Sequence, residues 1–449
     1  MKTYQDWLAC TTEDARQAFI LSLIAAHTAS TAYKTADKAE QYYRHLNPTI
    51  MHAQKITYDL MGRAHADVWA ANNKIPCRYY FYLVTQAVQF LLGNGVSFQN
   101  EETKDKLGAK FDRNVQQAAV YALNGGQSFG FWNADHLDVF PLTQFAPLYD
   151  GETGALRAGV RFWRLASDTP LRCTLFEEDG LTQYIQRKGE PLTVLEDKRA
   201  YVLNVGKSEA TGMEILDGEN YPTLPIVPLW NTNRQSEIVG MQEVLDAYDL
   251  MASALVNNID DANVIYWVIK NAGGMDDEDD ERFIQRLRTM HVAHTEGEEQ
   301  IDMHSVDVPF EASETALARL RTQIFDDFMG LDVKNIAGGA ATATQIKAAY
   351  EPLNSRADLF EYEVTDFIEG ILKLAGIEDE PTYTRSMIIN QQELIQNLVS
   401  AGEYLSDDYI TQKILEVLGD MDKVEDVLHE KAAADVSRFR DGDSESDNG

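Results

Sequence analysis

The longest regular pattern of apolar positions lies in the C-terminal half of the chain. Apolar residues recur there at alternating steps of four and three, namely Ile346, Tyr350, Leu353, Ala357, Phe360, Val364, Phe367, Ile371 and Leu374. This spacing predicts one long helix whose apolar stripe packs against helical neighbours along its length. Pro352 lies inside the stripe and removes one backbone hydrogen bond, so we expect the helix to bend there.

A second apolar stripe occupies residues 236–263, SEIVGMQEVLDAYDLMASALVNNIDDAN. It predicts a helix of about 40 Å that has Ser236 as its N-cap. The stripe consists of Ile238, Met241, Leu245, Tyr248, Ala252, Leu255, Ile259 and Ala262. A further helix is expected over residues 311–328. Between the two helices, IYWVIK and a stretch that ends near residue 309 read as strands.

Residues 128–203 follow a period of two instead. Short aromatic and β-branched runs such as SFGFWN, AGVRFWRL and AYVLNV are separated by turn residues such as the DGETG of 150–154. This pattern predicts an antiparallel sheet. The proline-punctuated segment after it, residues 221–234, reads as a linker.

Helices are predicted before the sheet. Residues 1 to about 70 have the pattern of polar amphipathic helix. A helix over 79–92 ends at Gly93, and another over 106–123 ends at an NGG turn. The apolar positions of the 79–92 helix are Phe81, Val84, Val88, Leu91 and Leu92.

The C-terminal part predicts one strand, TYTRSMII, and short helices in LIQNLVSAG, DDYITQKILEVL and DKVEDVLHEKAA. Ser406 precedes Asp407 and Asp408 and is a good N-cap for the second of these helices. We expect the polar, acidic tail DGDSESDNG to be disordered. The pattern as a whole assigns the chain to the α+β class.

The net charge of the chain limits which partners it can bind. The chain has 449 residues, with 72 Asp and Glu against 39 Lys and Arg, so its formal net charge is -33. Because Lys and Arg supply most non-specific affinity for DNA, a free protein of this charge should repel nucleic acid and anionic membranes. Solubility alone is the alternative reason for the acidity.

The cysteines and the apolar runs of the sequence indicate the cellular compartment of the protein. Cys10, Cys77 and Cys173 are odd in number and far apart, so no disulfide framework is expected. No apolar run reaches the length of a membrane span, and the first residues lack the apolar core of a signal peptide. We therefore expect a soluble cytosolic protein without a membrane partner.

No catalytic signature stands out. LLGNGV lacks the lysine of a P-loop, and no GxSxG motif is present. His291, His294 and His304 lie near one another. In a strand, however, the first two rings would point to opposite faces, and no Cys or acid completes a ligand set. We expect no catalytic residues, no metal site and no cofactor.

Four sequence blocks, in their order, resemble the portal protein family of tailed bacteriophages, of the siphophage type. They are NNKIPCRYYFYLVTQAVQFLLGNGVSF; LNGGQSFGFWNADHLDVFPLTQFAPLYD followed by AGVRFW; LPIVPLWNTNRQSEIVGMQEVLDAYDLMASALVNNIDD; and INQQELIQNLVSAGEYLSDDYI. The third block contains Asp246, Ala247, Tyr248, Ser253 and Asn258. The long helix lacks the Ser-Gly pair expected at its start and has Gly338 and Gly339 before it, and the segment before residue 70 matches no block.

The resemblance implies a portal architecture with a β-rich wing, a two-helix stem, a small α/β clip, a tunnel loop, a long kinked helix and a helical crown. The implied parts are the N-terminal helices and wing, 1–235; the first stem helix, 236–264; the clip, 265–307; the second stem helix, 308–331; the tunnel loop, 332–343; the long wing helix and strand, 344–390; and the crown with a disordered acidic tail, 391–449.

The resemblance also implies a function and partners. Such proteins form rings, usually of twelve subunits, at one capsid vertex, and double-stranded DNA passes through the bore without sequence specificity. The implied partners are the terminase large subunit, a head-completion adaptor, the major capsid protein and a scaffolding protein. The protein would belong to the virion, and to the host cytoplasm during assembly. The chain itself would not be an enzyme.

The segment around NIAGGAATATQIK would then be the loop that faces DNA. Its two glycines give backbone freedom, and its small and polar side chains allow exchangeable contacts with phosphates. The residues assigned to this role are Lys334, Asn335, Gly338, Gly339, Thr342, Thr344 and Lys347. The alternative is an ordinary linker between two helices, capped by Thr342 or Thr344.

The acidic run DDEDDE falls in the implied clip. It could dock a basic surface of the terminase or the adaptor through charge complementarity. The residues assigned to docking are Asp276, Asp277, Glu278, Asp279, Asp280, Glu281, Arg282 and Arg286. The alternative is a solvated flank of the following helix, favoured by the helix dipole.

Two sets of apolar residues are assigned to packing. The stem-helix set is Ile238, Met241, Leu245, Tyr248, Leu255 and Ile259, and the long-helix set is Ile346, Tyr350, Leu353, Phe360, Val364 and Phe367. Two other functions stay open on the sequence. One is another oligomeric phage head-tail structural protein, such as an adaptor or a minor capsid protein, and the other is a metal-dependent hydrolase.

Overall fold

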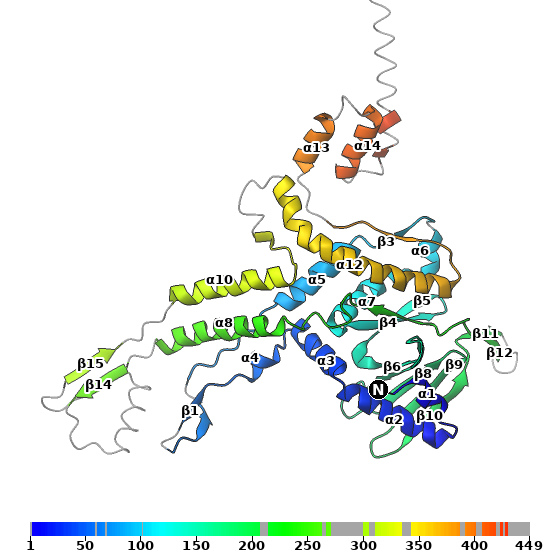
Figure 1. Cartoon of the computed structure of the whole chain (residues 1–449), viewed down its shortest axis with the longest axis horizontal. Coiled ribbons are helices and arrows are strands. Elements are labelled where there is room, and N and C mark those ends of the chain that lie inside the picture. The colour runs from blue at the N-terminus through cyan, green and yellow to red at the C-terminus, as the bar shows by residue number, and fades with distance from the viewer. Residues whose placement is uncertain are drawn as a thin grey trace, which may run out of the picture. The chain divides into compact units, whose positions relative to one another are not determined.

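Figure 1 shows the protein as a computed structural model. The structure describes residues 2–58, 61–67, 70–100, 102–206, 214–262, 266–270, 300–304, 310–334, 343–386, 391–400, 406–418, 423–424 and 427–429. The chain divides into two compact units. The larger unit comprises Met1–Gly330 and Ala357–Arg385, and the smaller unit comprises Leu331–Arg356 and Ser386–Gly449.

Helices precede and follow the main β-region in the order of the chain (Figure 1). Those described are α1 (Tyr4–Leu8), α2 (Glu13–Ala29), α3 (Thr31–Tyr43), α4 (Pro48–His52), α5 (Tyr79–Leu92), α6 (Glu102–Leu107), α7 (Phe111–Gly125), the 3-10 helix η1 (Leu142–Gln144), α8 (Gln242–Ala262), α10 (Phe310–Asp327), α12 (Ala343–Ala375), α13 (Gln391–Ser400) and α14 (Asp407–Leu418).

The strands concentrate between residues 127 and 230. In chain order the described strands are β1 (Ile56–Tyr58), β2 (Ala64–Ala66), β3 (Val96–Phe98), β4 (Gln127–Asn133), β5 (His136–Pro141), β6 (Phe145–Tyr149), β7 (Leu156–Trp163), β8 (Leu171–Glu177), β9 (Gly180–Gln186), β10 (Leu192–Arg199), β11 (Val202–Gly206), β12 (Glu214–Glu219), β13 (Ile226–Trp230), β14 (Tyr266–Lys270), β15 (Gln300–His304) and β16 (Pro381–Tyr383).

The antiparallel sheet predicted from the period of two is confirmed, but it is divided. Five strands pair antiparallel in the order β10-β9-β8-β7-β6, and three pair antiparallel in the order β13-β4-β5. An aromatic core lies between the two sheets, where Phe129 and Phe131 of β4 meet Phe145 of β6 and Phe176 of β8. The five-stranded sheet also buries side chains against α1 and α2, through Trp7 and Ile20 among others.

The predicted linker over 221–234 is wrong in its middle, because β13 lies there and pairs with β4. Pro228 makes a strand less expected there, because proline has no backbone N–H to donate to the hydrogen bonds of a sheet. The three-stranded sheet places β13 at an edge, where one side of the strand needs no donors. Pro147 in β6 occupies the matching position at the edge of the five-stranded sheet.

The other face of the three-stranded sheet carries the largest core. Trp132 and Leu137 pack there in one apolar cluster with residues of α5, α7 and the C-terminal part of α12. Gly130 of β4 lets α12 approach, because a Cβ atom there would lie 2.5 Å from the Phe367 ring carbon Cζ. Gly370 of α12 does the same for β13, since its Cβ would lie 2.7 Å from Val227 Cγ1.

The helix predicted over 79–92 is confirmed as α5, with Gly93 as its C-cap. Val84, Val88, Leu91 and Leu92 are buried as expected. Phe81 is the exception, since 37% of it is exposed. Its ring instead lies against Tyr43 and His45 at the surface.

The structure corrects two other helix predictions, one because a glycine interrupts the helix and one because strands replace it. The helix over 106–123 is divided into α6 and α7, because Gly108 has a φ of 86°, which a right-handed helix cannot contain. The helical pattern of the first 70 residues ends at α4. Beyond it, β1 and β2 form an antiparallel hairpin in which Ile56 pairs with Ala66.

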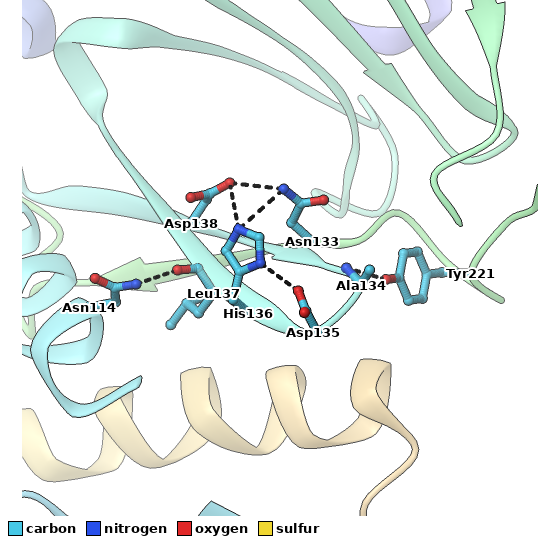
Figure 2. Close-up of polar contacts among 8 residues, drawn as sticks. All are labelled: Asn114, Asn133, Ala134, Asp135, His136, Leu137, Asp138 and Tyr221. Carbon is cyan, nitrogen blue, oxygen red and sulfur yellow. Dashed lines mark hydrogen bonds and ion pairs between the residues drawn. The ribbon is translucent and has the colours of Figure 1, made fainter. Parts of the chain in front are cut away.

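A local polar network holds the tip of the β4–β5 hairpin (Figure 2). Ala134 has a φ of 58°, and its N–H donates to the Tyr221 hydroxyl at 2.9 Å. His136 Nδ1 lies 2.7 Å from Asp135 Oδ1, and this hydrogen bond lowers the pKa of the Asp135 carboxyl. Asn114 of α7 donates to the Leu137 carbonyl at 2.6 Å, so the hairpin is joined to the helix that packs on it.

Helices α8 and α10 pack against each other within the larger unit. Figure 1 shows them side by side, with the β14–β15 pair between them in the sequence. At their base, Leu245 of α8 and Ile324 and Phe325 of α10 are buried in the large core. The strand predicted in IYWVIK is confirmed as β14, and α10 corresponds to the helix predicted over 311–328.

The N-terminal end of α8 differs from the prediction. Ser236 was the expected N-cap, but α8 begins at Gln242. Gly240 has a φ of 84°, so residues 236–241 form turns instead of a helical start. Ser236 Oγ still accepts a hydrogen bond, from the Ile238 N–H at 3.3 Å.

The smaller unit contains α13 and α14, which pack against each other. The predicted cap of α14 is confirmed, because Ser406 Oγ accepts from the Tyr409 N–H at 3.4 Å. The last predicted helix, DKVEDVLHEKAA, is described only at 423–424 and 427–429, and the acidic tail lies outside the described residues. Within the described ranges, none of the helices has the length and apolar character that a membrane span requires.

The long helix is confirmed as α12, which contains Pro352 and runs through the boundary between the two units. Of the residues assigned to its packing, Tyr350, Leu353, Phe360, Val364 and Phe367 are buried, whereas Ile346 is half-buried. The predicted strand after it is shorter than TYTRSMII: β16 pairs with β3 over Pro381–Tyr383.

Candidate functional site

One face of α8 is a row of polar side chains that the apolar-stripe analysis did not single out. The row repeats at steps of four and three, so its members lie on one side of the helix. We call it the polar seam, and it consists of Gln242, Asp246, Asp249, Ser253, Asn257 and Asp260. Its central residues are buried, with exposed fractions of 0% for Asp249, 3% for Ser253 and 6% for Asn257.

The seam binds the backbone of an extended segment, residues 73–77. The Cys77 N–H donates to Asp249 Oδ1 at 2.7 Å, and the Ile75 N–H donates to Ser253 Oγ at 3.0 Å. The Asn73 N–H donates to Asn257 Oδ1 at 2.7 Å. In extended chain every second N–H points to the same side, so alternate residues meet successive turns of the helix. The seam therefore replaces the partner strand that the segment lacks.

Side chains before the segment bind the N-terminal part of the seam. Tyr42 and Thr49 both donate hydroxyl hydrogen bonds to the Asp246 carboxylate, the latter at 2.8 Å. Lys38 Nζ donates to Gln242 Oε1 at 3.0 Å. Five consecutive members of the seam, from Gln242 to Asn257, thus each hold a residue between 38 and 77.

Asp249 is the most buried member of the seam. Its second carboxylate oxygen accepts from Asn47 Nδ2 at 2.5 Å. Burial raises the pKa of the Asp249 carboxyl, and the hydrogen bonds from Asn47 and Cys77 oppose that rise. Burial, with Asp249 beside it, also raises the pKa of the Cys77 thiol, which disfavours the nucleophilic thiolate form.

The seam joins two of the sequence blocks that carried the family resemblance. Asn73 to Cys77 belong to the NNKIPC opening of the first block, and Asp246 and Ser253 belong to the third block. The sequence analysis assigned neither set to a contact. The signal that could have revealed it is the polar repeat itself, which has the same spacing as the apolar stripe on another side of the helix.

The stem-helix packing residues divide along α8. Ile238, Met241 and Leu245 are buried, and Tyr248 and Leu255 are half-buried. Ile259 is 42% exposed in the single chain. The apolar stripe is therefore covered at the base of the helix and becomes progressively exposed towards its C-terminal end.

The residues assigned to the DNA-facing loop are only partly described. Lys334, Thr344 and Lys347 are exposed at the two flanks, and the Lys334 N–H donates to Asp332 Oδ1 at 3.1 Å. Thr344 is the second residue of α12, so it is not the N-cap of that helix. The other four, Asn335, Gly338, Gly339 and Thr342, lie outside the described residues.

The residues assigned to docking in the clip, from Asp276 to Arg286, also lie outside the described residues. So do His291 and His294, whereas His304 ends strand β15. The docking assignments therefore stay predictions.

A cavity of about 490 Å³ lies beside the WNTNR turn of the third block. The rings of Trp230 and Tyr149 stack on its wall with centroids 6.3 Å apart, and the Arg234 guanidinium lies 4.6 Å from the Trp230 ring centre. His27, on the same wall, hydrogen bonds the Leu142 carbonyl at 2.8 Å, and burial lowers the pKa of its imidazole. No carboxylate lines this cavity within the described chain.

Known proteins with similar sequences are phage portal proteins. The sequence model of the family described as "Phage portal protein, SPP1 Gp6-like" matches residues 23–436. The portal protein of Clostridium phage phiCD119 is 23% identical over 391 residues, which cover 79% of this chain and 83% of the relative. The portal protein of Bacillus phage SPP1 is 22% identical over 398 residues, which cover 81% of this chain and 76% of the relative.

Two solved structures resemble the chain more loosely. A chain from the neck of an empty gene transfer agent particle has a TM-score of 0.40 and 15% identity, covering 76% of this chain and 90% of that chain. A chain from the virion of a native gene transfer agent particle has a TM-score of 0.37 and 13% identity, covering 75% and 89%.

Proposed function

Because the chain belongs to the family of SPP1 Gp6-like phage portal proteins, and therefore acts as a portal at the capsid vertex of a phage, we propose that its copies form a ring around a DNA-conducting bore. Twelve copies are expected. The observation that carries the proposal is the family match over residues 23–436, most of the chain. The protein is a structural part of the phage particle, and we propose that terminase supplies the ATP hydrolysis.

The described elements support an assignment of parts within this proposal. The two packed helices α8 and α10 would form the stem, and β14 and β15 would belong to the clip between them. The two sheets with their covering helices would form the wing, α12 would be its long helix, and α13 and α14 would belong to the crown. Exposure of Ile259 in the single chain fits a stem that packs against neighbouring copies.

The loop before α12 would reach into the bore. Its described flanks carry the exposed residues Lys334, Thr344 and Lys347. Hydroxyl and ammonium groups can form and exchange hydrogen bonds with passing phosphates, while small residues leave room for the duplex. The loop would therefore follow the DNA without holding it.

The partners expected for such a ring are double-stranded DNA without sequence preference, the terminase large subunit, a head-completion adaptor, the major capsid protein and a scaffolding protein. The acidic run at 276–281 would dock basic surfaces of the terminase or the adaptor. Assembly would take place in the host cytoplasm.

Native mass spectrometry and negative-stain microscopy of the purified full chain test the ring. We expect particles many times heavier than the 50.5 kDa subunit, with a central hole. Lone subunits at micromolar concentration, or closed assemblies without an opening, would contradict the proposal.

The negative charge of the chain leads to a second test. A duplex carries one negative charge per about 1.7 Å of its axis, so an acidic bore repels it and keeps it from adhering to the wall. Asp326 and Asp327 are exposed at the end of α10, shortly before the loop. Replacing both by lysine should slow DNA packaging roughly tenfold, because each lysine in each copy adds a phosphate contact.

Packaging velocity measured in vitro with purified terminase checks this expectation. The slowing should diminish as salt is raised, because salt screens charges beyond a Debye length of about 8 Å. Replacing the exposed Glu152 and Glu190 of the β-region by lysine adds the same charge elsewhere and serves as the control. An unchanged velocity in the Asp326 and Asp327 variant would show that these acids do not act on the duplex.

A further inference from the structure

The segment that follows the β1–β2 hairpin is bound to α8. Residues 73–77 run antiparallel to α8, with Cys77 at Asp249 and Asn73 at Asn257 and Asp260. The chain before Asn73 therefore continues towards the C-terminal end of α8. Lys74 Nζ binds the Met51 carbonyl, so the end of α4 is held at the same level. The hairpin thus stands near Ala262, the end of α8 from which the chain continues to β14.

The hairpin is too small to be stable alone. Within the described chain, β1 and β2 pair only with each other, over three residue pairs. Isolated two-stranded hairpins are marginal in water, and their open edges tend to pair with another strand. Ile56 of β1 is 59% exposed, so the hairpin presents apolar surface to solvent in the single chain.

The direction of its free hydrogen-bonding groups follows from the ladder. The Asp67 N–H donates to the Lys55 carbonyl at 2.8 Å. Because hydrogen-bonded and non-bonded pairs alternate in an antiparallel ladder, Thr57 faces β2, and the N–H groups of Ile56 and Tyr58 face outward. The outer edge of β1 is thus available for a further strand.

The β14–β15 pair has matching properties. Like β1 and β2, strands β14 and β15 form a two-stranded sheet and pair with no other strand in the described chain. Strands β1 and β2 contain no Asp, Glu, Lys or Arg, and β14 and β15 contain one Lys and one Asp. In a chain of net charge -33, these are places where two copies can approach without strong repulsion.

We propose that the β1–β2 hairpin of one copy pairs edge to edge with the β14–β15 strands of a neighbouring copy, forming a continuous sheet across the subunit boundary. The inference rests on the proposed ring and adds to it a contact between adjacent copies. The polar seam fixes the hairpin at the clip end of the stem, and main-chain hydrogen bonds to the second copy satisfy its outer edge.

Crosslinking between differently tagged copies tests the proposal. One full chain carries Ile56→Cys, the other carries Val268→Cys or Ile269→Cys, one for each face of β14, and both carry Cys10→Ser. Burial raises the pKa of the Cys77 and Cys173 thiols, so both should react with maleimide more slowly than an exposed cysteine. After co-assembly, a short bismaleimide should link the two tags, and rings made from either chain alone should give no such product.

A backbone test accompanies it. Ile56→Pro removes one outward N–H and keeps the β1–β2 ladder, whereas Ile56→Val keeps the N–H and the apolar side chain. In mild urea, Ile56→Pro should raise about tenfold the protein concentration below which the rings dissociate, because main-chain pairing is lost at each subunit boundary. Ile56→Val should leave that concentration unchanged.

The outcomes separate the two proposals. If the cysteine variants assemble into intact rings without crosslinks between the two tags, and Ile56→Pro has no effect on ring stability, the hairpin contact is overturned and the ring is left standing. Rings that survive Ile56→Pro but lose binding of the adaptor or terminase would assign the hairpin to that partner instead. A wild-type chain that forms no ring would overturn both.

Discussion

Replacing Asp249 by leucine is expected to release residues 73–77 from helix α8. The change leaves the Cys77 N–H and the Asn47 amide without their acceptor in a site from which water is excluded. Each orphaned donor costs about 1–3 kcal/mol. Hydrogen exchange followed by mass spectrometry should show faster exchange of the Ile75 and Cys77 amides, by roughly one to three orders of magnitude. Asp249→Asn keeps one acceptor oxygen and should have a smaller effect.

The matched control is Glu243→Leu, an exposed acid in the first turn of the same helix. It removes the same charge from α8 without touching the seam, so exchange at Ile75 and Cys77 should stay slow. If Asp249→Leu behaves like this control, the seam does not hold the segment.

The pH dependence of stability gives an independent check on the burial of the Asp249 carboxyl. Burial raises the pKa of its carboxyl above the value in the unfolded chain. A group of this kind contributes stability that is complete below its unfolded pKa, about 4, and that is lost as the pH rises through its folded pKa. The Asp249→Asn variant cannot ionise at this position. Its thermal midpoint should therefore fall less than that of the wild type as the pH is raised from about 4.

Replacing Gly130 by alanine is expected to disturb the packing of α12 on the three-stranded sheet. A methyl group there would lie 2.5 Å from Phe367 Cζ and 3.0 Å from Leu137 Cδ1, closer than van der Waals contact allows. Both neighbours are buried in the largest core, so neither can move aside. Gly130→Ala should lower the free energy of unfolding by about 1–3 kcal/mol. Phe367→Ala, which leaves a cavity, should lower it by about 3–5 kcal/mol.

The double variant tests the contact itself. The added methyl group occupies part of the space that Phe367→Ala leaves empty, so the combined loss should be smaller than the sum by at least about 0.5 kcal/mol. Urea titration followed by tryptophan fluorescence is suitable, because Trp132 is buried in the same cluster. Gly151→Ala, whose neighbour is the movable Gln5 side chain, is the control. Strict additivity would show that Gly130 and Phe367 do not act as a pair.

The sequence predicted the long elements well for a physical reason. In α12 the apolar residues from Phe360 to Ile371 repeat at helical spacing because they face the largest core, and that spacing is visible in the sequence itself. The predictions failed where a single backbone conformation decided the outcome. Gly108 and Gly240 adopt positive φ and interrupt helices whose side-chain patterns continue through them.

The candidate site was less predictable. The individual members of the seam are ordinary polar residues, and solvent exposure is the usual fate of such residues on a helix. Their burial depends on residues 73–77, which lie about 170 positions away in the chain and present backbone groups that carry no sequence signal. The family blocks contained both halves of this contact without showing that they meet.

Taken by itself, the chain determined its helices and strands, its acidity and, through the order of its blocks, its family. These follow from side-chain periodicity, charge and local turn chemistry, which are properties of neighbouring residues. Tertiary structure alone decided that the β-region splits into two sheets, that Pro228 lies in an edge strand and that Asp249 is buried under Asn47 and Cys77. Each of these depends on which distant backbone groups need a hydrogen-bond partner, and only the folded chain brings those groups together.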